Sequence, residues 1–322
     1  MRWTNLAIIF SLFLFLTVIA QDIRLNNLSA INNKEREYTI YLDNAVDDGT
    51  QNLVELDVNK KNLVLMKEKA VDQFYTSLYA NFGILGDKKK EELLSRYIPI
   101  ILITDEEGFY INYTDIYQKD NESIYVKRWT EKFPYTLEDR NLIYHFSIND
   151  KEALTIYDEN TQEILKGSRK DLKEIYPESE ILTDSEVFDT YRRNTIIKLV
   201  EEKMNYYINQ YNDIAYQFGI TYQFWLPQVD ETDWYRTIDN ISMFVVFQGY
   251  PYQVGSLDTY NRYAFGGARI NKSRTYFITE KDGMKYYHKA NCSNTGGRTG
   301  AVYYTPEDCA KEGAFPDPDC NP

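Results

Sequence analysis

The chain offers few residues for catalysis by a nucleophile or an imidazole. Its only two histidines are His145 and His288, and all three cysteines follow residue 290. A Ser-His-Asp triad would have to use one of these histidines, and neither accompanies a nucleophile elbow. No phosphate-binding loop or dinucleotide-binding glycine pattern is present, because Gly266-Gly267 alone is not one. We therefore assign no catalytic residue and expect no cofactor in the main body.

Carboxylates are the abundant source of chemistry. With 49 Asp and Glu, a pair that hydrolyses glycosidic bonds is compatible with the sequence, but spacing singles out no pair. Asp43, Asp47 and Asp48 could hold a cation through oxygen ligands. A solvated helix face is the alternative, because helical carboxylates do not wrap around an ion, and a contact with a neighbouring subunit is the third.

The C-terminal tail is the most motif-like stretch. It combines Tyr287-His288-x-x-x-Cys292, an acidic segment at 304–308 and the ending Asp317-Pro318-Asp319-Cys320. From Thr275 onward it resembles a small bacterial tail module found on nucleases and surface proteins, in which one His and three Cys form a tetrahedral zinc set. The resemblance implies a metal set of His288, Cys292, Asp317 and Cys320, with Asp317 in place of a cysteine.

The tail has an alternative to structural zinc. In an oxidising compartment a Cys292–Cys320 disulfide could close it and leave Cys309 as the odd thiol. A third possibility is that neither a metal nor a disulfide links the tail. In all three cases we expect a structural role, since a module of this size is too small to be held by its own core.

The N-terminal stretch Leu6–Ala20 contains 15 residues without a charge. It is short of the ~20 residues that span a bilayer and slightly long for the core of a signal peptide. Val18-Ile19-Ala20 before Gln21 satisfies the small-residue rule for signal peptidase. Residues 1–20 are therefore interpreted as a signal peptide or, if uncleaved, as a membrane anchor through residues 6–20. Both alternatives predict an extracytoplasmic protein, membrane-anchored or secreted.

Composition narrows the class of partner. The net charge of −13 argues against nucleic acid, which requires a basic surface. The 29 Tyr residues are open to two interpretations, namely an aromatic surface that binds glycans or peptides and the bias of a low-GC bacterial genome. Confinement of all cysteines to the tail excludes a disulfide scaffold for the main body.

The elements expected before the sheet are helical, so residues 21–96 are interpreted as a helical region. Apolar residues recur at helical spacing over 32–58 and 67–82, with a short strand between them and another helix opening at Lys88. Gly83 is placed to cap the second of these helices. Ser29–Asn33 is turn-like and follows Asp22 and Arg24, so we expect the apolar segment and the first helix to be separate.

Residues 97–270 are expected to form an α+β domain with an antiparallel sheet. Strand patterns occur at 97–103, 109–113, 123–129, 141–148, 154–157, 220–226 and 241–248. A long helix over 184–218 has a capping box at Thr183–Glu186 and a terminal Gly219. The turn Asp105–Gly108 between two strands, with this helix nearby, makes 97–250 similar to sensor domains of the PAS or Cache type. Residues 271–322 form the small C-terminal module.

A second resemblance concerns the N-terminus. The apolar segment followed by Leu42-Asp43-Asn44-Ala45-Val46-Asp47-Asp48 and a β-rich body resembles the TadE-like minor pseudopilins of tight-adherence pili. The resemblance implies a retained anchor, a helix that continues into a fibre or assembly base, and envelope or pilus-assembly proteins as partners.

Two function classes follow from the sequence. The favoured hypothesis is a non-enzymatic extracytoplasmic protein of a bacterial cell envelope, acting in surface or pilus-like assembly or in ligand binding. The alternative is a secreted carboxylate-dependent hydrolase, which predicts a deep pocket where two carboxylates converge within about 5–10 Å.

Overall fold

The computed structural model describes residues 2–57, 62–119, 122–148, 152–252, 257–268, 276–281, 283–289, 298–303 and 306–318. The chain divides into two compact units, Met1–Ala268 and Arg269–Pro322. Helices and sheets of antiparallel strands occur together in the described residues, so the expected α+β class is confirmed.

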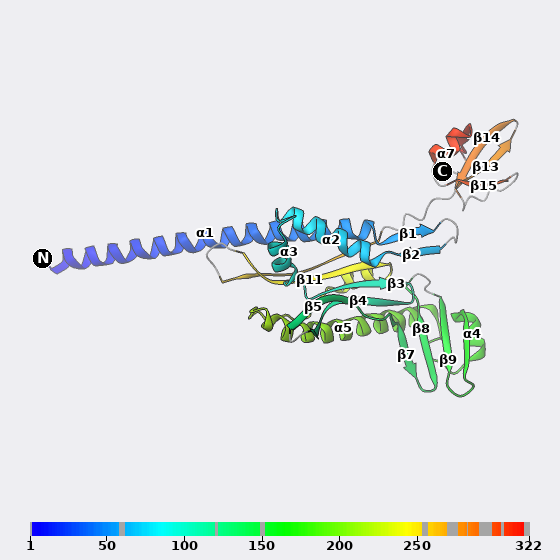
Figure 1. Ribbon diagram of the computed structural model, residues 1–322, viewed down its shortest axis with the longest axis horizontal. Coiled ribbons are helices and arrows are strands. Elements are labelled where there is room, and N and C mark those ends of the chain that lie inside the picture. The colour runs from blue at the N-terminus through cyan, green and yellow to red at the C-terminus, as the bar shows by residue number, and fades with distance from the viewer. Residues whose placement is uncertain are drawn as a thin grey trace. The chain divides into compact units, whose positions relative to one another are not determined.

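The first helix, α1, runs without interruption from Arg2 to Gln51 (Figure 1). The prediction of a break at Ser29–Asn33 is therefore wrong. Residues 2–48 contain no Gly or Pro, and a Ser or Asn in a helix costs less than about 0.7 kcal/mol relative to Ala. The predicted helix over 32–58 also ends too late. After Gln51 the chain turns so that Leu53 is fully buried, and it continues as β1, Val54–Asp57.

A second helix packs against the C-terminal half of α1, and a third helix follows it in the chain. Strand β1 pairs with β2 (Asn62–Leu65), which leads into α2 (Lys67–Asn81) and α3 (Lys88–Ser95). Gly83 has φ +64°, as expected of a residue that ends a helix. A Cβ at Gly49 would lie 3.0 Å from the Ala70 carbonyl oxygen. Glycine at this position therefore lets α1 and α2 pack closely.

The central sheet has the strand order β12-β11-β3-β4-β5, and β6 pairs with β4. Its strands are β3 (Ile100–Asp105), β4 (Gly108–Lys119), β5 (Glu122–Trp129), β6 (Phe133–Pro134), β11 (Ser242–Pro251) and β12 (Thr259–Gly267). Helices α1 and α2 lie on one face and the long helix α5 on the other (Figure 1). The sheet forms the middle layer because β3 and β11 are apolar on both faces.

The long helix α5 spans Ser185–Gln217 and ends at Gly219, whose φ is +78°. Its N-cap is Asp184, whose carboxylate accepts from the Val187 amide at 2.9 Å, rather than Thr183 of the predicted capping box. The predicted strand over 220–226 is wrong. The amides of Phe224 and Trp225 donate to the side chains of Asn212 and Gln248, so these bonds replace a strand ladder.

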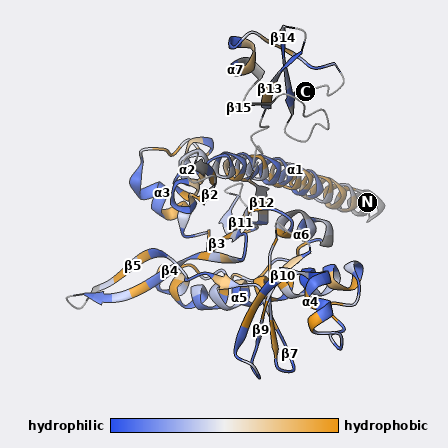
Figure 2. Ribbon diagram, turned by 90° about the vertical axis from the view of Figure 1, so that its right-hand side faces the viewer, coloured by the Kyte–Doolittle hydropathy of each residue, from blue (hydrophilic) through white to orange (hydrophobic). Residues whose placement is uncertain are grey.

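A second sheet has the order β10-β9-β8-β7. It consists of β7 (Thr136–Asp139), β8 (Leu142–Phe146), β9 (Ala153–Asp158) and β10 (Glu163–Ser168), followed by α4 (Arg169–Ile175). Burial alternates along β9, with Leu154 and Ile156 inside, and Figure 2 shows hydrophobic residues along these strands. This alternation leaves one face of the sheet open.

A buried arginine connects this sheet with α5 and with α6 (Glu231–Ile238). The Arg192 side chain is 0% exposed and donates to Asp189 at 2.7 Å and Asp239 at 3.1 Å. It also donates to the Ser147 carbonyl oxygen at 3.3 Å. Burial acts to raise the pKa of Asp189, but the hydrogen bonds and charges of Arg192 and Arg193 outweigh it and lower that pKa. The network therefore holds three elements through one charged cluster.

The C-terminal unit contains a small sheet of order β15-β13-β14-β16. Its elements are β13 (Tyr276–Lys281), β14 (Met284–Lys289), β15 (Arg298–Tyr303), α7 (Pro306–Lys311) and β16 (Ala314–Pro316). Its core contains Tyr276, Ile278, Cys309 and Ala314. Cys309 is buried as a free thiol, and burial raises its pKa.

Candidate functional site

The N-terminal half of α1 exposes apolar side chains in every direction. Leu12, Phe13, Leu14 and Phe15 are 61%, 62%, 47% and 64% exposed. Four successive residues of an α-helix point to all sides, since each is rotated by about 100° from the one before. Exposed apolar residues continue to Leu28. In the part of the chain that the structure describes, no helix combines the length and apolarity needed to cross a membrane.

The C-terminal half of α1 is packed on one side against the first unit. The Tyr38 ring lies 4.9 Å from the Phe82 ring, 5.6 Å from Tyr250 and 5.7 Å from Tyr260. Leu42, Ala45 and Val46 are buried. These contacts hold the helix while its N-terminal half projects beyond the other elements of the unit (Figure 1).

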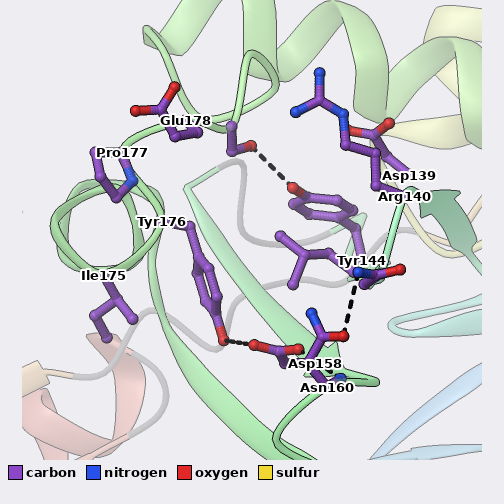
Figure 3. A pocket seen from close by; sticks show the side chains of 12 residues that line it. Asp139, Arg140, Tyr144, Asp158, Asn160, Ile175, Tyr176, Pro177 and Glu178 are labelled. Atoms are coloured by element: carbon purple, nitrogen blue, oxygen red, sulfur yellow. Dashed lines mark hydrogen bonds between the residues drawn. The ribbon is translucent and has the colours of Figure 1, made fainter.

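A cavity of about 300 Å³ lies where the β7–β8 and β9–β10 turns meet the segment after α4. Figure 3 shows Tyr144 and Tyr176 on opposite sides of it, with Asp158 and Asn160 at one end. Ser179 hydrogen-bonds to the Tyr144 hydroxyl at 2.9 Å, and the Tyr176 hydroxyl donates to Asp158 at 3.3 Å. The Asp158 carboxylate also accepts from the backbone N–H of Asn160 at 2.9 Å.

The tyrosines of this cavity stay protonated. Burial raises the pKa of Tyr144, and the Ser179 hydrogen bond acts in the opposite direction. Burial also raises the pKa of Tyr176, and the negative charge of Asp158 adds to the effect. Arg140 at the rim has φ +56°, a backbone conformation that non-glycine residues seldom adopt. None of these residues stood out in the sequence, because three separate turns bring them together.

The open face of the second sheet forms a groove of about 830 Å³, lined by His145, Glu107, Glu138, Lys132 and Lys166 among others. His145 lies in the strand that the sequence predicted. Burial lowers its pKa, with the charge of Glu107 acting in the opposite direction. The Lys166 ammonium lies 3.3 Å from the Glu107 carboxylate. The groove therefore contains a neutral imidazole beside an ion pair that is already formed.

The predicted metal set lies only in part within the described residues. His288 is 1% exposed and Asp317 is 8% exposed, while Cys292 and Cys320 lie outside the described residues. The His288 Nε2 is 2.7 Å from the Thr279 hydroxyl, and its Nδ1 is 3.8 Å from an Asp317 oxygen. This arrangement suits a metal-ligating histidine, whose second nitrogen commonly bonds a neighbouring group. The zinc set and the alternative disulfide both stay predictions.

The acidic residues of α1 do not form a cation site. Asp43 and Asp47 are exposed, and Asp48 accepts a hydrogen bond from Ser77 of α2. Across the described ranges no three His, Cys, Asp or Glu side chains are placed to hold a metal ion. Comparison of the chain with protein families, curated proteins and solved structures finds no match.

Proposed function

We propose that this chain is a non-enzymatic extracytoplasmic protein of a bacterial cell envelope that acts in pilus-like assembly. The N-terminal half of α1, residues 2–28, is the assembly element, and copies of the same helix are its partners. The observation that carries the proposal is the exposure of apolar side chains on every side of this half.

The energy of covering this surface supports the proposal. Burial of a Leu, Ile or Phe side chain contributes about 1.5–3 kcal/mol. Twelve large apolar residues between Ile8 and Leu28 are at least 39% exposed. A groove on one partner would cover a single face, whereas a bundle of helices from several copies surrounds each helix. The all-round distribution therefore favours a bundle.

The length of α1 agrees with such an arrangement. A helix of 50 residues extends about 75 Å at the usual rise per residue. Only its C-terminal half is needed to attach it to the sheet, through Tyr38, Leu42 and Val46. The uncovered half can therefore enter a bundle without disturbing the core of the first unit.

The test combines cell fractionation with N-terminal sequencing of the processed protein. We expect residues 6–20 to be retained and the protein to occur in the envelope fraction as assemblies of many copies. A mature chain that begins at Gln21 would contradict the proposal, because cleavage would remove most of the assembly element.

A further inference from the structure

The cavity around Tyr144 and Tyr176 is built from residues far apart in the chain. Tyr144 comes from β8, Asp158 from the end of β9, and Tyr176 from the segment after α4. Tyr144 is 0% exposed and Asp158 is 7% exposed. The volume of about 300 Å³ is at the lower end for pockets that hold small molecules.

The hydroxyl groups of both tyrosines are committed to protein partners. The Tyr144 hydroxyl pairs with Ser179, and the Tyr176 hydroxyl with Asp158. The Tyr144 ring is fully buried, so the partly exposed Tyr176 ring is the aromatic surface that is accessible from the cavity. The electron-rich faces of such rings attract organic cations.

The charges around the cavity also favour a cation. Three carboxylates line it, those of Asp139, Asp158 and Glu178, against the single guanidinium of Arg140. Glu178 is exposed at the rim, while Asp158 is held in place by Tyr176 and Asn160. The carboxylates are not grouped for a metal ion, since no three such ligands converge anywhere in the described residues.

We propose that this cavity binds a small organic cation, a primary or quaternary amine with an apolar body. The partly exposed Tyr176 ring would contact the alkyl groups, and the carboxylates would neutralise the charge. The proposal is independent of assembly through α1, because the cavity and the apolar half of the helix share no residue.

The test is isothermal titration calorimetry of the full chain in a non-ionic detergent, with choline and putrescine as probes. Two matched compounds serve as controls: 3,3-dimethylbutan-1-ol, which has the shape of choline without its charge, and sodium acetate. We expect at least one of the two amines to bind and both controls to leave no measurable heat. Equal binding of the uncharged alcohol, or binding of acetate alone, would overturn the proposal.

Variants assign the binding to this cavity. Tyr176→Ala is expected to weaken amine binding about tenfold or more, as expected for loss of a partly desolvated cation–π contact. Tyr176→Phe keeps the ring and should restore affinity to within about threefold. Tyr157→Ala, on the opposite face of the same sheet, should leave affinity unchanged. Absence of amine binding to the folded wild-type chain, or equal affinity of wild type and Tyr176→Ala, would contradict the assignment.

Discussion

The two halves of α1 differ in their surroundings although they belong to one continuous helix. In the C-terminal half Tyr38, Leu42, Ala45 and Val46 follow helical spacing and pack against α2 and the central sheet. In the N-terminal half the apolar residues are consecutive and exposed on all sides. An apolar stripe can be buried by one neighbouring surface, whereas a helix that is apolar on all sides is buried only when other molecules surround it. The difference separates an attachment region from an assembly region.

The largest expected effect follows from a charge in the apolar half. Phe13→Asp should reduce the fraction of protein in sedimentable assemblies at least tenfold. Packing of the helices in a bundle would bury the new, unpaired carboxylate of each copy. The thermal unfolding temperature of the first unit should not change. Tyr206→Asp is the matched control, since Tyr206 is 60% exposed on α5. Unaltered sedimentation of Phe13→Asp would contradict assembly through α1.

Substitutions at charged residues test whether α5, on the opposite face of the central sheet, is attached differently from α1. Arg192→Met should lower the free energy of unfolding by about 3 kcal/mol, because Asp189 and Asp239 lose a fully buried donor and keep only the less buried Arg193. Arg128→Met is the control, since its side chain is 52% exposed in its contact with Asp115. It should cost about 1 kcal/mol or less. Urea denaturation measures both, and equal costs would show that the buried network adds no stability.

The attachment region of α1 depends on apolar packing. Leu42→Ala should lower the free energy of unfolding by about 2–5 kcal/mol through the cavity it leaves. Leu25→Ala, at a position 65% exposed in the other half, should change it by less than about 0.5 kcal/mol. Similar losses for the two variants would remove the distinction between the halves.

A smaller effect concerns the pH dependence of the free energy of unfolding through Lys127, whose Nζ lies 5.7 Å from the centre of the Tyr211 ring of α5. Burial lowers the pKa of Lys127 to about 7, and its Nζ donates to the Ile98 carbonyl oxygen at 2.9 Å. Between pH 7 and the ordinary lysine pKa near 10.4 the unfolded chain binds more protons at this residue than the folded chain. Stability should therefore rise with pH, with a slope of up to about 1.4 kcal/mol per unit.

The check compares wild type with Lys127→Met in urea denaturations from pH 7 to about 8.5, well below the ordinary tyrosine pKa near 10. Lys127→Met should remove the rise, and Lys166→Met should preserve it, because the Lys166 side chain is 70% exposed. A rise that persists in Lys127→Met would have to originate from another group.

Local patterns in the sequence were sufficient for most elements. The spacing of apolar residues predicted α2 and α5, and strand-like runs of apolar and branched residues predicted β3, β5, β8 and β11. Gly83 and Gly219 have the positive φ that their positions after helices required. The segment 220–226 failed because its apolar pattern is that of a strand, while its amides bond to side chains on α5 and β11.

The cavity could not have been predicted in the same way. Tyr144, Asp158 and Tyr176 have no shared spacing, and their meeting depends on how α4 packs beside β10 and on the turns of the second sheet. Arg192 is a similar case, because arginine is seldom fully buried and only the fold shows that this one is.

The sequence by itself determined the apolar character of residues 6–20 and the helical stripe that follows, since both depend on neighbouring residues. Only the tertiary structure decided that the two form one helix with one half covered and the other half exposed. The reason is that coverage depends on contacts with α2, β11 and β12, whose residues are distant in the chain. No local pattern records which of two apolar stretches those partners will reach.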